Sequence, residues 1–221
     1  NTNVGSQKAI SIGLTYLKKI KKETIVTVMD SDGEDDASKI SYMIKKAEKN
    51  KDKVIVSSRT KRHENLLFKI LYFFHKFITF IFTLSWISFG SFSSFHSNNL
   101  KNILKNNSSW LAFSACISKN CKTLKTFAER KKRFLGNSKL SFYGLMKHSL
   151  RVNAVFFQRI IFFSFIYAFV LTNFVFFNSK FNFYLIALLI LYNTTIFSTI
   201  ILNNSSNFKI SNKFIKSLKK I

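Results

Sequence analysis

Cysteine, proline and acidic residues are all scarce in this chain of 221 residues. The two cysteines, Cys116 and Cys121, have no second pair near them, which is too few for a disulfide framework or a zinc site. We therefore expect two ordinary reduced thiols. Proline is absent while Lys, Asn, Ile and Phe are abundant, which indicates that codon bias has shaped part of the composition.

The shortage of acids leaves a strongly basic chain, with 35 Lys and Arg against 10 Asp and Glu and a formal charge of +25. Such a charge favours anionic partners, namely phosphates, nucleic acid or an acidic membrane surface. Because codon bias contributes to the lysine content, charge alone does not select one of these partners. No recognisable nucleic-acid-binding module is present, so we expect no nucleic-acid partner. A hydrophobic content of 47% excludes a disordered polymer.

Half of the few acids are gathered in one loop, which follows the apolar β-branched run 24–29: Asp30, Asp32, Glu34, Asp35 and Asp36. Asp30 and Asp32 are separated by one residue where a predicted strand ends, so both carboxylates can turn toward one point. Hard oxygen ligands at this spacing suit Mg²⁺ or Mn²⁺, and Glu34 can complete the site directly or through water. The alternative is a solvated acidic turn that caps the helix beginning near Ser38. The spacing alone leaves both interpretations open.

The first third of the chain alternates between helix and strand. An amphipathic helix is predicted over 7–22 and a second helix over 38–49, with strands over 24–29 and 53–58, the latter ending at Arg59. This alternation predicts an α/β fold with a mostly parallel sheet, whose ligands bind at the carboxyl edge of the strands. The acidic loop and Arg59 both fall at that edge. Since the chain opens on a helix directly before a strand, we expect a fragment that lacks upstream elements.

Two long runs near the end of the chain, 160–177 and 181–202, contain no charged residue. As helices they would be about 27 and 33 Å long at ~1.5 Å per residue, which matches a bilayer core of ~30 Å. Only 178–180 separates them, so we expect a transmembrane helical hairpin. Lys and Arg crowd its outer flanks, and the positive-inside rule then places both ends in the cytoplasm. The alternative is a pair of buried core helices.

The run 66–89 is rich in Phe, Ile and Leu but is interrupted by Lys69, His75 and Lys76. Its uninterrupted apolar part is short for a membrane span, so we expect an interfacial helix, with a buried helix or a third span as alternatives. No periodicity is evident over 91–129. The predicted organisation is thus a partial catalytic domain over 1–150, a hairpin over 151–203 and a basic cytoplasmic tail over 204–221.

Five short segments precede the two apolar runs in this order: "NVGSQKA" at 3–9, "VMDSDGED" at 28–35, "VSSR" at 56–59, "GSFSSF" at 90–95 and "RFLGNSK" at 133–139. In these segments the chain resembles the polyprenyl-phosphate glycosyltransferases of glycosyltransferase family 2, the type of dolichyl-phosphate mannose synthase and bactoprenol glucosyltransferases. The resemblance implies a GT-A-like, Rossmann-like fold. It also implies inverting transfer of one sugar from a nucleoside diphosphate, of the UDP-glucose or GDP-mannose class, to a dolichyl or undecaprenyl phosphate at the membrane.

The resemblance also implies roles for particular residues. Asp30 and Asp32 would be catalytic and, with Glu34, would hold Mg²⁺ or Mn²⁺. The nucleotide-sugar phosphates would be bound by Asp30, Ser31, Asp32, Arg59, Arg133 and Lys139. The lipid phosphate would be bound by Arg133, Ser138 and Lys139. The family's opening strand and base-binding loop are not part of the sequence, so the fragment alone is expected to lack part of the nucleotide pocket.

The chemistry agrees with these residue types independently of the family. A sugar leaving from a nucleoside diphosphate needs its leaving group neutralised, which a metal ion and arginines can do. A lipid phosphate is already anionic, so the acceptor needs little help from a general base, and the acidic loop has no His near it in sequence. The oligomeric state, including a homo-oligomer, stays open.

Two other functions remain to be compared with sugar transfer. Processive polysaccharide synthases usually carry a Q-x-x-R-W motif, and the sequence has none. The other alternative is a catalytically inactive, membrane-anchored adaptor or decayed enzyme that binds anionic lipid. Its marker would be lipid binding that survives the loss of Asp30 and Asp32.

Overall fold

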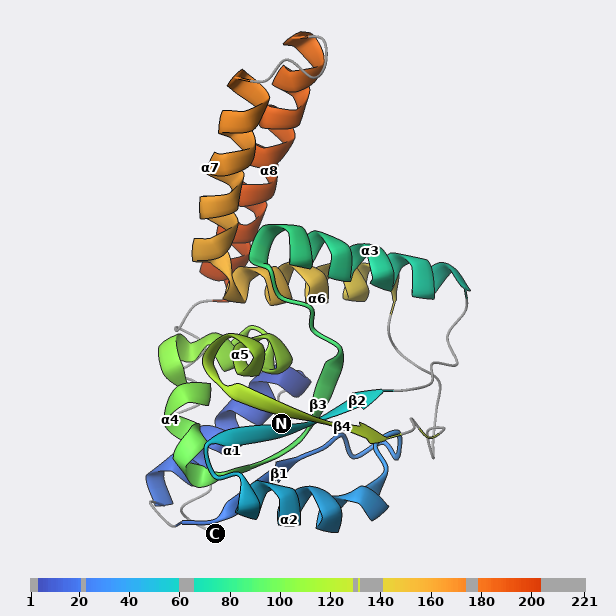
Figure 1. Cartoon of the computed structure of the whole chain (residues 1–221), viewed down its shortest axis with the longest axis vertical. Helices are drawn as coiled ribbons and strands as arrows, with labels where there is room; N and C mark the ends of the chain where they lie inside the picture. Colours follow the sequence, from blue (N-terminus) through green and yellow to red (C-terminus); the bar gives the residue numbers. More distant parts are fainter. Residues whose placement is uncertain are drawn as a thin grey trace.

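The computed structural model describes residues 4–20, 23–59, 66–128, 131, 141–173 and 179–203. Figure 1 shows a sheet with helices at one end of the molecule and a pair of long helices at the other. The elements in chain order are α1 (Ser6–Ile20), β1 (Ile25–Val28), η1 (Ala37–Lys39), α2 (Ile40–Lys49), β2 (Lys53–Arg59), α3 (Leu66–Thr83), β3 (Phe89–His96), η2 (Ser97–Asn99), α4 (Leu100–Ile103), η3 (Lys105–Trp110), α5 (Phe113–Asn120), β4 (Lys122–Ala128), α6 (Phe142–Val155), α7 (Phe157–Asn173) and α8 (Ser179–Leu202).

The fold is α/β, as predicted, but the sheet is mixed. Its strand order is β1-β3-β2-β4, and β3 is antiparallel to both of its neighbours while β2 and β4 are parallel. The prediction of a mostly parallel sheet is therefore wrong for the described strands. Its error was to miss β3, in which Phe89, Phe92 and Phe95 recur every third residue instead of alternating. The register between β2 and β3 is also irregular, because the two steps from Val56 to Ser58 face the four steps from Ser93 to Phe89.

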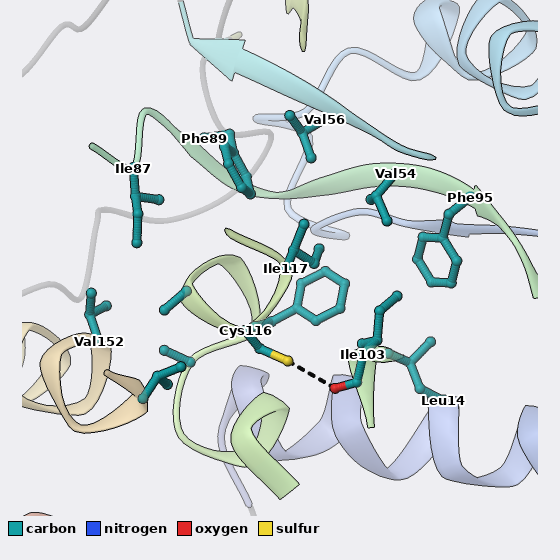
Figure 2. Packing of buried hydrophobic residues seen from close by; sticks show 14 of the residues in the cluster. Leu14, Val54, Val56, Ile87, Phe89, Phe95, Ile103, Cys116, Ile117 and Val152 are labelled. Carbon is teal, nitrogen blue, oxygen red and sulfur yellow. Dashed lines mark hydrogen bonds between the residues drawn. The ribbon is translucent and has the colours of Figure 1, made fainter. Parts of the chain in front are cut away.

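Helices cover both faces of this sheet. Val54 and Val56 point to the face covered by α1 and α5, and Ile55 points to the face covered by α2, as alternation along a strand requires. Figure 2 shows the first face, where Val54, Val56 and Phe95 of the strands lie opposite Leu14, Ile103 and Ile117. This core fixes the strand ends at which the candidate site lies.

The two long C-terminal helices, α7 and α8, lie side by side and run in opposite directions (Figure 1). Their bounds are close to the predicted runs 160–177 and 181–202. Within the described residues, α8 alone is long and apolar enough to cross a membrane. The 17-residue α7 reaches that length only together with α6, from which it is bent by 87°. The structure therefore establishes one candidate span, α8, and a second, bent candidate that α6 and α7 form together.

The predicted interfacial helix over 66–89 ends earlier than expected, at Thr83. The backbone turns at Leu84, whose φ of 53° no helix can accommodate. Arg159 of α7 donates from Nη1 to the carbonyl oxygen of Thr83 at 3.0 Å, which satisfies one of the last carbonyls of α3. Residues 85–88 then lead into β3. An apolar run that contains only Ser and Thr as polar residues gives no signal for such a stop.

Candidate functional site

One edge of the sheet collects the segments that the sequence analysis singled out. Since β1, β2 and β4 point in the same direction, the acidic loop after β1, Arg59 at the end of β2 and Ala128 at the end of β4 share this edge. The antiparallel β3 begins here, so Ser91 lies here as well. In register, Arg59 pairs with Ala128. The prediction that the acidic loop and Arg59 lie on a common edge is confirmed.

The acidic loop is held in shape by its own carboxylates and by β3. Ser91 donates from Oγ to Oδ1 of Asp30 at 3.0 Å, and the backbone N–H of Asp30 donates to Oδ2 of Asp35 at 2.9 Å. The N–H of Glu34 donates to Oδ1 of Asp32 at 3.1 Å. Between them Gly33 has a φ of 84°, which glycine adopts without steric cost. Asp30 is thus positioned both through its side chain and through its backbone.

Asp36 performs the capping role that was the alternative for the loop. It is the N-cap of η1, which leads into α2, and its Oδ1 accepts from the N–H of Ser38 at 3.1 Å and from the Ser38 hydroxyl at 2.8 Å. The ammonium of Lys131 lies 2.8 Å from the same oxygen. Hydrogen bonds from Lys131 and then Ser38 lower the pKa of Asp36 to about 2. The acids of the loop therefore do not all have the same role, since Asp36 has a structural one.

Lys131 connects the segment after β4 to the acidic loop. Besides the ion pair with Asp36, its backbone N–H donates to the carbonyl oxygen of Glu34 at 2.9 Å. Sequence reasoning missed this role, because Lys131 stood in a basic run that positive-inside decoration explains. It also gave no role to Ser91, although "GSFSSF" was one of the quoted segments. No local signal singles out Ser91, because β3 contains three serines among its eight residues.

The predicted site residues fall into three groups. Asp30 and Asp32 are partly exposed at the edge and Ser31 is exposed between them, whereas Glu34 is buried, with 8% of its surface exposed. Arg59 is placed by its backbone alone. The predicted phosphate ligands lie outside the described residues: Arg133, Ser138 and Lys139.

The predicted metal trio is not assembled in the structure. Across the described ranges, no three His, Cys, Asp or Glu side chains are arranged so that they could hold a metal ion. The oxygen-only donor pair of Asp30 and Asp32 nevertheless fits Mg²⁺ or Mn²⁺, since Mg²⁺ in particular commonly takes one or two carboxylates and fills its shell with substrate phosphates and water.

The two cysteines play no part at this edge. Cys116 is buried and donates from Sγ to the carbonyl oxygen of Ile103 at 2.8 Å (Figure 2). Burial raises the pKa of Cys121 to about 12, so its thiol stays protonated and unreactive at neutral pH. Both are free thiols, as expected from the sequence.

Comparison with known proteins adds no relationship: no family model, curated protein or solved structure matches the chain. The residue types at this edge nevertheless indicate what kind of ligand suits it. The carboxylates after β1 share this edge with the backbone position of Arg59 at the end of β2, and Lys131 after β4 forms an ion pair with Asp36. Carboxylates bind metal ions and cations bind phosphate oxygens, so this pairing suits a metal-bound phosphate or diphosphate.

Proposed function

We propose that the chain is the anchored body of an inverting glycosyltransferase, which moves one sugar from a nucleoside-diphosphate sugar to a polyprenyl phosphate. The observation that carries this proposal is that three of the quoted segments, far apart in sequence, meet at one sheet edge: 28–35 and 56–59 reach it at the ends of β1 and β2, and 90–95 starts there in β3. The hydrogen bond from Ser91 to Asp30 joins two of them directly. Lys131, just before the fifth quoted segment, contacts the same loop.

Each residue of this edge has a task in the proposed transfer. Asp30 and Asp32 would hold Mg²⁺ or Mn²⁺, which when bound neutralises the diphosphate leaving group. Ser91 directs the Asp30 carboxylate, and Asp35 holds the Asp30 backbone. Arg59, whose backbone lies at the same edge, would bind the diphosphate. Lys131 keeps the segment that follows β4 close to the loop.

The acceptor side of the proposed reaction needs no histidine. A polyprenyl phosphate is already anionic, so its oxygen can attack the sugar without a strong general base. Among the described histidines, His96 pairs with Ile25 at the opposite edge of the sheet. His75 and His148 lie on α3 and α6. Metal-assisted departure of the diphosphate, with attack from the opposite face of the sugar, fits this distribution.

The proposal includes a hairpin of two membrane spans, α7 and α8, with both ends in the cytoplasm. Large apolar side chains on the outside of this pair support it, such as Phe165, Phe169, Leu188 and Leu191. One polar pair is turned inward: Nδ2 of Asn193 donates to Oγ of Ser164 at 2.8 Å, across the two helices. Lipid is the solvent for which this arrangement is stable.

The test is sugar transfer in membranes from cells that express the complete gene. Labelled UDP-glucose and GDP-mannose are each offered with undecaprenyl and dolichyl phosphate, with and without EDTA. We expect EDTA-sensitive transfer that falls by about 100-fold or more in Asp32→Asn, since such contacts act on the charged leaving group. Asp52→Asn is the matched control, because Asp52 lies before β2 at the opposite edge and pairs only loosely with Lys122, at 3.8 Å. Equal activity of the Asp32 and Asp52 variants would contradict the proposal.

The adaptor alternative has one observation in its favour. Asp32, Asp35 and Asp36 all accept hydrogen bonds from backbone N–H groups of their own loop, which a purely structural acidic turn would also show. A complete gene product that transfers no sugar from any donor, yet binds anionic vesicles equally well with and without Asp32→Asn, would support the adaptor.

A further inference from the structure

Helix α3 carries a continuous apolar stripe on its outer side. The stripe follows helical spacing, with steps of three and four residues, and its members expose between 42% and 73% of their surface: Leu66, Ile70, Phe73, Phe77 and Phe80. Leu84, just after the last residue of the helix, is 62% exposed and continues the stripe. Trp86, beyond the helix end, extends it, since its ring lies 6.3 Å from that of Phe73 and 6.1 Å from that of Phe80. Side chains of this size in one row are unusual on a water-facing surface.

The inner side of the same helix is polar along its middle, although Phe82 near its end packs against a small apolar cluster. Thr79, which is buried, donates from Oγ1 to Oδ1 of Asn153 on α6 at 2.9 Å. One turn earlier, Nδ1 of His75 lies 2.6 Å from Oγ of Ser149. A helix packed on a protein in water buries its apolar stripe and exposes its polar one. Around His75 and Thr79, α3 does the reverse, so its outer face is matched to an apolar surrounding.

The position of α3 identifies that surrounding. Figure 1 shows α3 and α6 side by side, between the sheet and the α7–α8 pair. Since α7 is bent by 87° from α6, helices that cross a bilayer through α7 and α8 leave α6, and α3 beside it, running along the bilayer surface. Lys76 reaches over the ring of Trp86 at 4.7 Å, as a lysine does when its stem lies along apolar groups and its ammonium seeks the headgroups.

We propose that α3 and α6 form a platform that lies in the headgroup layer of an anionic bilayer, with the apolar stripe of α3 dipping into the acyl chains. Phe142, Tyr143 and Met146, exposed on the first turns of α6, would enter the same layer. The proposal rests on the membrane-anchoring part of the proposed function and not on sugar transfer. The platform holds the sheet at one height, so that an acceptor embedded in the membrane meets the catalytic edge without leaving the lipid.

The chain carries its own probe for this platform, because its two tryptophans differ in burial. Trp86 exposes 43% of its surface in the stripe, whereas Trp110 lies in the sheet part and exposes 5%. The full chain is placed in vesicles of phosphatidylcholine and phosphatidylglycerol whose acyl chains carry bromine either near the headgroup or near the chain end. In Trp110→Phe, which leaves Trp86 alone, shallow bromine should remove about half of the emission or more, and deep bromine clearly less.

Trp86→Phe, which leaves Trp110 alone, is the matched control and should lose almost no emission with either lipid. If Trp110→Phe folds poorly, the quenching of Trp86 is obtained instead as the difference in quenched emission between wild type and Trp86→Phe. Equal quenching of the two tryptophans would overturn the platform, and stronger quenching by deep bromine would show that α3 crosses the membrane. Sugar transfer is measured on the same vesicles, so an active enzyme with an unquenched Trp86 would refute the platform and leave the proposed function standing.

Discussion

The sheet part and the helical part of this molecule differ in where their large apolar side chains lie. In the sheet part, Phe95 and Phe113 are completely buried and the loops carry the charges. In α3, α6, α7 and α8, many contacts between helices are polar, such as Thr79 with Asn153 and Asn193 with Ser164, and the large apolar side chains point outward. A small apolar cluster around Ile160 is the exception.

This contrast teaches that phenylalanine has no fixed energetic role in the chain. In the sheet part a Phe is removed from water by the protein, which stabilises the fold by burial. On α3 the proposed lipid layer would be what removes an outer Phe from water, so its contribution would appear as membrane contact and not as folding stability. Substitutions at matched Phe positions can test whether one amino-acid type has these two roles.

The largest expected difference lies between Phe95→Ala and Phe77→Ala. Phe95 is fully buried, so its truncation should lower the free energy of unfolding by about 3–5 kcal/mol through lost transfer energy and a cavity. Phe77 is 45% exposed, and its truncation should change the stability in detergent by less than about 0.5 kcal/mol. Guanidinium unfolding in detergent, followed by Trp110 emission in a Trp86→Phe background, measures both. Similar losses for the two variants would end the contrast.

Acid should loosen the helical part before the sheet part. Burial, and to a lesser degree the nearby charges of His148 and Lys76, lowers the pKa of His75 from 6.5 to about 4. A released histidine therefore binds a proton at a higher pH than the docked one. The docking of α3 is unaffected above about pH 6.5, weakens as the pH falls from 6.5 toward 4, and loses on the order of a few kcal/mol over that window.

Hydrogen exchange of α3 amides at several pH values measures this loss. His75→Gln supplies a polar group that can still bond Ser149 but does not titrate, so its exchange should depend less on pH. A residual dependence is expected from His148, whose pKa is also lowered by burial and by Arg151. Identical pH profiles for wild type and His75→Gln would show that this histidine does not control the docking.

Local sequence patterns predicted the elements whose residues follow a single pattern, such as an apolar β-branched run or a long run without charge. Strand β2, with Val54, Ile55 and Val56 in a row, and α8, which contains the uncharged run 181–202, were both found within a few residues of their bounds. Strand β3 could not be found, because its partners are set by tertiary packing and an irregular register, which no local pattern encodes. The end of α3 at Thr83 depends on Arg159, which lies far away in sequence.

The candidate site was predictable only in part for the same reason. The spacing of Asp30 and Asp32 at the end of a strand was visible locally, and so was a possible cap near Ser38. That Asp36 alone would cap, while Asp35 closes the loop on Asp30, depends on the turn at Gly33. The contribution of Lys131 depends on how β4 returns to the loop, which requires the sheet.

A smaller effect tests the polar seam between α3 and α6. Thr79→Val removes the donor that satisfies the Asn153 amide, and leaving this buried acceptor unpaired should cost about 1–3 kcal/mol. Thr79→Val combined with Asn153→Leu removes both polar partners, so part of the loss should return. Thermal unfolding in lipid nanodiscs measures the single variants Thr79→Val and Asn153→Leu and the double variant. A double variant whose loss equals the sum of the single losses would indicate that the two side chains are not coupled.

The smallest expected effect is at Asp36, in the part of the molecule that faces water. Asp36→Ala removes the N-cap and should cost about 1 kcal/mol, whereas Asp36→Asn keeps a capping oxygen and should lose a few tenths. Because the pKa of Asp36 is lowered to about 2, its contribution is constant above pH 4 and disappears only as the pH falls toward 2.

Salt should weaken the ion pair of Asp36 with the exposed Lys131 and leave the buried Thr79–Asn153 bond unchanged. Unfolding at low and high salt therefore distinguishes the two parts: an Asp36→Asn loss that is unchanged by salt would place this pair, against expectation, out of contact with water.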